Sequence, residues 1–157
     1  MRMQGKIGLV TAAGSGMGKA GAIRFAKEGA SVGVVDINPK AVDTVVQEIK
    51  KAGGNAIGIV ADLTKDKESK RIVTETANHF EGLDFVWNHV GYPGPASIEG
   101  IEMKDFELTL DLNLRTILVT TEAALSEFRI RGGGSLLYTA SSSGLMGSGF
   151  SPVYSMA

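Results

Sequence analysis

The stretch "KIGLVTAAGSGMGKAGAIRFAKEGASVGVVDIN", residues 6–38, decides the fold. It starts as a short apolar run ending in small residues, passes through a glycine-rich turn, and continues with apolar residues at helical spacing. A β-branched run closed by Asp36 follows. This order predicts a buried strand, a helix over residues 17–28 and a second strand. Two apolar strands joined by a helix are typical of a parallel sheet covered on both faces.

The same alternation continues to the end of the chain. Further helices are predicted over 41–54, 66–80 and 103–128, and further strands over 55–64, 83–90 and 134–141. No repeat or linker divides the chain, and "YPGPAS", residues 92–97, is predicted to be a loop after the fourth strand. Right-handed crossovers then predict one α/β domain over residues 1–157, with a doubly wound parallel sheet of order 3-2-1-4-5.

Composition excludes several classes of function. The net charge is −1 and acidic and basic residues are mixed along the chain, so we expect neither a nucleic acid nor a membrane as partner. The chain has no cysteine, which excludes disulfides, thiolate nucleophiles and cysteine-ligated metals. The opening "MRMQGKIGLV" resembles neither a signal peptide nor a spanning helix, and a cytoplasmic protein is expected.

Glycines gather at the turn that follows the first strand. In a doubly wound sheet, ligands bind beyond the carboxyl ends of the strands, where the strand order reverses, and this turn lies there. Backbone N–H groups and the positive end of the helix dipole favour a pyrophosphate, which approaches only where side chains are absent. A tight turn without a ligand is the alternative. The predicted cofactor-binding residues of the turn are Gly14, Ser15, Gly16, Met17 and Gly18.

Asp36 closes the second strand, 18 residues after Gly18. At this place a carboxylate can accept hydrogen bonds from both hydroxyls of an adenosine ribose, next to Ile37, although it could also simply cap a turn. The carboxylate would repel a 2′-phosphate, and neither Ser15 nor Asn38 supplies a cation to hold one. NAD is therefore predicted in preference to NADP.

With these features together, the sequence resembles the short-chain dehydrogenase/reductase family and its Rossmann-like fold. The TGxxxGxG turn of the family falls on Thr11, Ala12, Gly16 and Gly18, with Ala12 in place of the first glycine. The resemblance implies that Asp62, which is followed by Leu63 in "ADLT", contacts the adenine.

The family's NNAG stretch corresponds to "NHVG", residues 88–91, which keeps only the first and last members. The resemblance implies that Asn88, His89 and Gly91 lie beside the cofactor. His89 also suggests a metal or acid–base role, but no partner ligands occur at suitable spacing, so no metal site is predicted. His79, late in a helix, is expected to be solvated.

The resemblance further implies three catalytic residues, Asn113, Ser141 and Tyr154, and the last two have the family spacing of 13 residues. Hydride transfer to a carbonyl carbon leaves negative charge on the oxygen, which requires a proton donor. Tyr154 is assigned as that donor, Ser141 as the group that orients the same oxygen, and Asn113 as an aid in placing a water. Taken singly, the three could instead be a core tyrosine, a helix cap and a surface amide.

The family also has a lysine four residues after the tyrosine. This cation brings a phenol, whose ordinary pKa is about 10, within reach of neutral pH, and it holds the nicotinamide ribose. Because "YSMA" stops one residue before that position, we expect an amino-terminal portion, truncated after the fifth strand. The expected activity is NAD-dependent interconversion of a small-molecule secondary alcohol and a carbonyl, in a homodimer or homotetramer when intact. The alternative is a nucleotide-binding module without turnover, or an inactive fragment.

Overall fold

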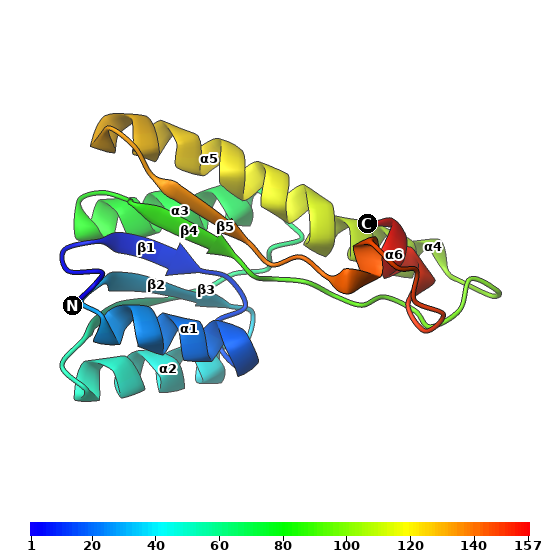
Figure 1. The fold of residues 1–157 in the computed structure, drawn as a ribbon, viewed down its shortest axis with the longest axis horizontal. Helices are drawn as coiled ribbons and strands as arrows, with labels where there is room; N and C mark the ends of the chain where they lie inside the picture. The colour runs from blue at the N-terminus through cyan, green and yellow to red at the C-terminus, as the bar shows by residue number, and fades with distance from the viewer.

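A computed structural model describes residues 1–157, and its centre is a single parallel sheet (Figure 1). The strands are β1 (Ile7–Val10), β2 (Ser31–Asp36), β3 (Asn55–Val60), β4 (Phe85–Asn88) and β5 (Ser135–Tyr138). Their order is β3-β2-β1-β4-β5, which confirms the predicted doubly wound topology. The order reverses beside β1, so the carboxyl ends of β1 and β4 flank the point where a ligand is expected.

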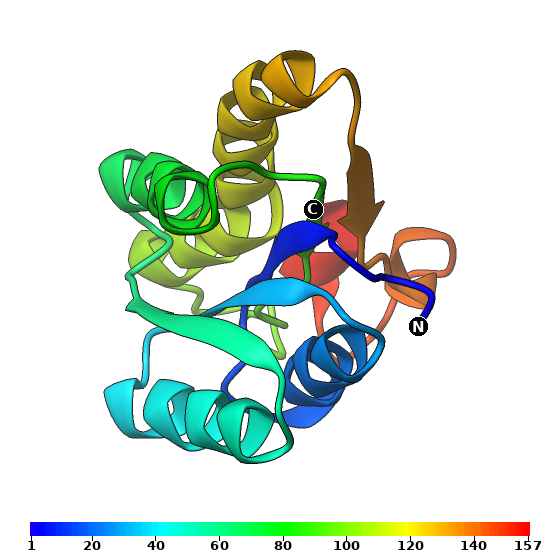
Figure 2. The ribbon, with the colours of Figure 1, turned by 90° about the vertical axis from the view of Figure 1, so that its left-hand side faces the viewer.

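Helices cover both faces of the sheet. Figure 2 shows α1 (Gly16–Lys27) and α2 (Pro39–Lys51) on one side, and α3 (Asp66–Phe80) and α5 (Thr116–Arg131) on the other. Because neighbouring strand residues point to opposite faces, Val10 packs toward α1 and α2 whereas Leu9 packs toward α3 and α5. Both residues are fully buried. The sheet is thus buried between two apolar layers.

The helix predicted over residues 103–128 is interrupted. It consists of α4 (Met103–Leu110), a π-helical turn (Asp111–Arg115) and α5. Asn113 Nδ2 donates to Thr109 O at 2.8 Å, and so takes the carbonyl that its own backbone N–H would use in an α-helix. The N–H of Thr116 then bonds to Asp111 O, five residues back. The hydrogen bond of the Asn113 side chain therefore explains why the helix has a π-helical turn at this place.

Long connections extend beyond the carboxyl ends of β4 and β5 (Figure 1). The connection after β5 contains a 3-10 turn (Ser142–Gly144) and ends in the short helix α6 (Pro152–Met156), which packs beside α4. Helix α6 was not predicted. It begins with Pro152, whose fixed φ suits the first position of a helix. None of the helices combines the length and apolar character that a membrane-spanning segment needs.

Candidate functional site

The turn between β1 and α1 presents free hydrogen-bond donors. Gly14 N donates to Asp36 Oδ2 at 2.9 Å, but the backbone N–H groups of Ser15, Gly16, Met17 and Gly18 have no acceptor within the protein. The first three of these residues are exposed, and no acidic side chain lies in the first turn of α1. Unpaired amides at the positive end of a helix dipole fit an anionic group such as a diphosphate. The role of the turn in holding a cofactor stays a prediction.

Two glycines of the turn are required by close packing. A Cβ added to Gly18 would lie 2.2 Å from Ala12 O, and one added to Gly14 would lie 2.8 Å from the carboxylate of Asp36. Gly16 has open space around it but a φ of 53°, in the left-handed region. Ala12 has a φ of 51° and is therefore strained at a position where the family pattern has glycine.

A pocket of about 390 Å³ lies beyond the carboxyl ends of β1 to β4. Its lining residues are Ala12, Asp36, Ile37, Ala61, Asp62, Leu63, Thr64, Val90, Leu108 and Leu112. Four residues predicted to bind the cofactor thus line this pocket: Asp36, Ile37, Asp62 and Leu63. The rest of its lining is mostly apolar. Apolar surface suits the faces of a heteroaromatic base, and carboxylate oxygens suit the hydroxyls of a ribose.

Both carboxylates also cap local turns. Asp36 Oδ1 accepts from Asn38 N at 3.0 Å, and Asp62 Oδ1 accepts from Thr64 Oγ1 at 2.7 Å. Turn capping, the alternative considered for Asp36, is therefore observed. It does not exclude ligand binding, because a carboxylate has about four acceptor positions and these contacts leave others free.

Thr11 joins the end of β1 to the segment after β4. Its buried hydroxyl oxygen accepts from His89 N at 2.9 Å and from Val90 N at 3.0 Å. This positioning role was not predicted, although Thr11 is the first residue of the TGxxxGxG motif. The contact holds His89 and Val90 against the glycine turn.

Asn88 is fully buried and lines neither this pocket nor the one described next. Its Oδ1 accepts from Thr120 Oγ1 of α5 at 2.7 Å, and its Nδ2 has no partner. The side chain therefore faces the α5 layer and does not reach either pocket.

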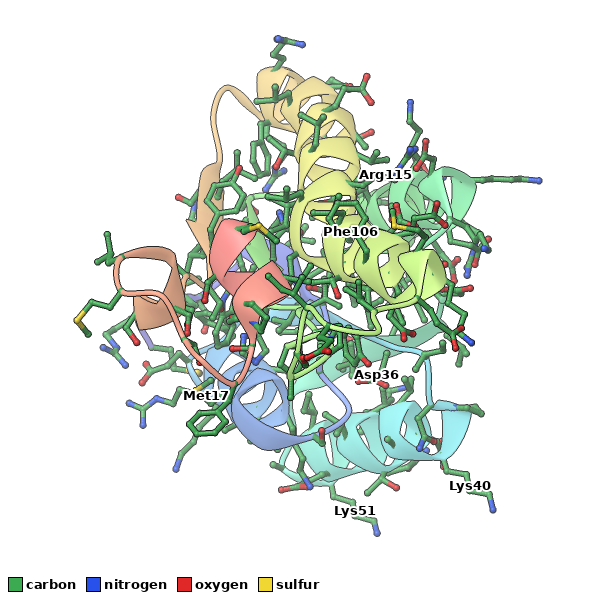
Figure 3. All side chains as sticks on the ribbon, turned by 90° about the vertical axis from the view of Figure 1, so that its right-hand side faces the viewer. Met17, Asp36, Lys40, Lys51, Phe106 and Arg115 are labelled. Carbon is green, nitrogen blue, oxygen red and sulfur yellow. The ribbon has the colours of Figure 1, made fainter.

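A second pocket, of about 340 Å³, opens beyond the carboxyl ends of β4 and β5. It is lined by His89, Val90, Gly91, Asn113, Leu114, Ile117, Tyr138, Thr139, Ala140, Ser141, Gly144, Tyr154 and Ala157. All three predicted catalytic residues meet here, from the π-helical turn, the connection after β5 and helix α6. Figure 3 looks onto this end of the molecule, with Met17 and Asp36 marking the glycine turn and the end of β2.

The three residues have different surroundings. Ser141 Oγ accepts from Ser143 N at 3.2 Å and so caps the 3-10 turn, which leaves its proton free to donate. Tyr154 is half-buried, and its hydroxyl makes no hydrogen bond within the protein. Asn113 Oδ1 accepts from Tyr92 N at 3.1 Å while its Nδ2 donates to Tyr92 O at 2.8 Å. The Asn113 side chain thus holds the loop after β4, and it leaves only one acceptor position of its Oδ1 free.

His89 packs against Trp87, with ring centroids 4.8 Å apart, and its Nδ1 lies 2.8 Å from Thr139 Oγ1. Burial lowers the pKa of its imidazole below the ordinary value. No group of three or more histidine, aspartate or glutamate side chains is arranged to hold a metal. His79 is exposed.

The comparison with protein-family models decides the family. The model of the short chain dehydrogenases matches residues 6–157. The chain belongs to the short-chain dehydrogenase family. This confirms the resemblance inferred from the motifs.

The proteins most similar to this short-chain dehydrogenase include other oxidoreductases. The chain is 36% identical over its whole length to an uncharacterized oxidoreductase of Thermotoga maritima. It superposes with a TM-score of 0.94 and 32% identity, over 99% of its length, on a 7α-hydroxysteroid dehydrogenase complexed with NADH and 7-oxo glycochenodeoxycholic acid. It also superposes on a short-chain dehydrogenase of Burkholderia cenocepacia in complex with NADP, with a TM-score of 0.92 and 28% identity over 99% of its length. The chain spans 62%, 60% and 64% of the lengths of these three proteins, respectively.

Proposed function

We propose that the protein binds NAD and interconverts a secondary alcohol and a carbonyl compound by hydride transfer, with Tyr154 as the acid or base. One observation carries the proposal. Asn113, Ser141 and Tyr154 belong to three separate segments of the sequence, yet they line one pocket. This pocket lies at the same end of the sheet as the glycine turn with its free backbone N–H groups. The pocket that contains Asp36 and Asp62 lies at the same end of the sheet and offers a place for the adenosine.

Each residue has a role that follows from its chemistry. When bound, the nicotinamide supplies or accepts the hydride. Tyr154 gives a proton to the oxygen that gains negative charge, or removes it when an alcohol is oxidised. Ser141 donates a hydrogen bond to the same oxygen and stabilises its charge. Asn113 holds the loop at Tyr92 and so sets the shape of the pocket.

Preference for NAD rests on the charge at the end of β2. A 2′-phosphate placed on the ribose would meet the carboxylate of Asp36 and be repelled. Figure 3 shows the Lys40 side chain extending outward from α2, away from Asp36. Solved relatives include complexes with NADH and with NADP, so the preference is a proposal for this chain alone.

A nucleotide-binding protein without turnover is the second candidate. The free amides of the glycine turn and the pocket of Asp36 and Asp62 would bind a nucleotide without any catalytic residue. We also propose that the protein forms a homodimer or homotetramer, as the sequence predicts, through apolar side chains that α5 exposes.

The test of the function is Tyr154→Phe. We expect this change to lower the rate of NADH formation from a panel of secondary alcohols by about 10²–10⁴-fold, while NAD affinity measured by calorimetry changes less than about twofold. NADP should bind more weakly than NAD. Tyr138→Phe is the matched control, because Tyr138 lines the same pocket but its hydroxyl contacts Thr121.

The outcomes separate the two candidates. Undiminished turnover by the Tyr154→Phe variant would refute the catalytic assignment. NAD binding without turnover in the unmodified protein would favour the binding module.

A further inference from the structure

The π-helical turn lies between the two pockets and contributes a side chain to each. Leu112 lines the pocket of about 390 Å³ that contains Asp62, here called the adenosine pocket. Asn113, the next residue of the turn, lines the Tyr154 pocket, and Val90 lines both. The two pockets therefore share a wall, and a displacement of the turn would change the shape of both.

Thr116, directly after this turn, ties it to the segment that follows β3. Its side chain is buried, and Thr116 Oγ1 lies 2.6 Å from Leu63 O and 2.9 Å from Asp111 O. A hydroxyl has only one proton to donate, and the shorter distance makes Leu63 O the main acceptor. Leu63 lines the adenosine pocket next to Asp62. One buried hydroxyl thus links the turn that carries Asn113 to a wall of the adenosine pocket.

The segment after β3 depends on few such contacts. Leu63 O also accepts from Ser69 Oγ of α3 at 3.1 Å, and this hydroxyl is buried as well. Asp62 Oδ1 accepts from Thr64 Oγ1 at 2.7 Å, so the direction of the Asp62 carboxylate follows that of its own segment. The two donors at Leu63 O therefore also fix the carboxylate that lines the adenosine pocket.

A second link between the turn and α3 is exposed to solvent. Arg115 Nη1 lies 3.2 Å from Asp66 Oδ2, and both side chains are more than half exposed; Arg115 is labelled in Figure 3. Water and salt screen an exposed ion pair, which consequently contributes little. A buried carbonyl that loses a donor has no water to replace it. The Thr116 hydroxyl is therefore the contact that fixes the turn.

We propose that Thr116 is a positioning residue, whose hydrogen bond to Leu63 O holds the π-helical turn against the segment after β3 and so keeps the shapes of both pockets together. The inference rests on the proposed NAD binding and adds to it a residue that lines neither pocket. Because the turn is shared, a ligand in the adenosine pocket should also steady Asn113 in the Tyr154 pocket.

The first test measures AMP affinity by calorimetry. We expect AMP to bind about threefold to tenfold more weakly to Thr116→Val, because valine has no proton to donate. Its methyl group at the place of Oγ1 would also lie 2.6 Å from Leu63 O, closer than the carbon–oxygen contact distance of about 3.3 Å. Thr116→Ser keeps the hydroxyl and should restore AMP affinity to within about twofold of the unmodified protein.

Two controls accompany this test. Thr74→Val makes the same chemical change at an exposed position of α3, where the hydroxyl bonds only to its own helix. Arg115→Gln removes the exposed ion pair with Asp66. Each should leave AMP affinity within about twofold of the unmodified protein.

The second test reads the other pocket through amide hydrogen exchange at Tyr92, whose N–H donates to Asn113 Oδ1. In the unmodified protein, saturating AMP should slow this exchange by about threefold to tenfold, although Tyr92 lines neither pocket. In Thr116→Val without ligand, the Tyr92 amide should exchange faster by a similar factor, and AMP should no longer slow it. The amides of β2 report on the whole sheet and should be unchanged.

The outcomes separate this inference from the proposed function. Equal AMP affinity in Thr116→Val and the unmodified protein, or a loss that Thr116→Ser does not restore, would overturn the inference alone. So would an effect of AMP on Tyr92 exchange that persists in Thr116→Val. If the unmodified protein bound neither AMP nor NAD, the proposed function would fail, and an unchanged Tyr92 exchange rate in ligand-free Thr116→Val would overturn the role of Thr116 as well.

Discussion

Ala12 shows how one methyl group strains the glycine turn. Its φ of 51° lies in the left-handed region, where an L-residue pays about 1–2 kcal/mol and glycine pays almost nothing. The turn keeps this conformation because its neighbours are fixed: Ala13 N donates to Val35 O at 2.8 Å and Thr11 N donates to Trp87 O at 3.1 Å. The strain is therefore a property of this chain that its backbone contacts impose.

We predict that Ala12→Gly stabilises the protein. Relief of strain should exceed the added chain entropy of the unfolded state and raise the free energy of unfolding by about 0.5–1 kcal/mol. Thermal unfolding would show this as a midpoint higher by about 1–4 °C. The control is Ala20→Gly, at an exposed position inside α1, which should destabilise by about 0.5–1 kcal/mol. A midpoint that falls in both variants would contradict the account of Ala12.

At the scale of elements, Asp84 connects three of them at the end of the sheet opposite the site. Its Oδ2 accepts from Ile7 N of β1 at 2.9 Å and from Arg131 Nη2 of α5 at 3.2 Å, and Lys6 Nζ lies 3.6 Å from its Oδ1. Burial acts to raise the pKa of this carboxyl, but the Ile7 N–H and the charges of Arg131 and Lys6 outweigh it and hold the pKa below its ordinary value.

We predict that this contact stabilises the protein in a pH-dependent way. Because the pKa of Asp84 is lowered by folding, its contribution is complete above the unfolded value of about 3.9 and is lost as pH falls through the lower folded value. Asp84→Ala should lower the free energy of unfolding by about 1–3 kcal/mol at pH 7, and this difference should shrink below about pH 4.

Urea unfolding at several pH values measures the difference. Asp43→Ala, an exposed carboxylate on α2, serves as control and should change stability by less than about 0.5 kcal/mol. A difference for Asp84→Ala that is the same at pH 7 and pH 3 would disprove the linkage.

At the scale of the whole molecule, α5 exposes apolar side chains on its outer face. Leu118 is 71% exposed on α5, and a groove of Leu110, Leu114, Leu118 and Val119 is bordered by Asp66, Glu107, Asp111 and Arg115. In a two-fold contact the same groove of two copies would meet, so that apolar side chains pack together and charges of opposite sign pair at the border.

We predict that Leu118→Glu shifts the protein toward monomer in sedimentation equilibrium, because it places a charge in the apolar contact. The control is Lys51→Gln on α2, which is labelled in Figure 3. It changes the net charge by the same amount but lies on the other face of the sheet, so it should leave the association unchanged. An unmodified protein that sediments as a monomer at micromolar concentration would contradict self-association.

The limits of sequence reasoning appear at the interrupted helix. The apolar spacing of residues 103–128 correctly indicates helix, because periodicity depends only on neighbours along the chain. The π-helical turn depends on the Asn113 side chain bonding to Thr109 O, and that side chain is also held by the backbone of Tyr92, 21 residues away. Such a contact exists only after the loop beyond β4 has folded back.

The sequence by itself determined the strand order, the glycine turn and the family, since these follow from apolar periodicity and from residue types at set spacings. It also named Asn113, Ser141 and Tyr154 as candidates. Only the tertiary structure decided that these three share one pocket, that Asn88 faces α5, and that Thr11 and Thr139 hold His89. The physical reason is that hydrogen bonds and side-chain directions depend on which strand ends become neighbours, and residues 11, 89 and 139 become neighbours only when the sheet brings β1, β4 and β5 together.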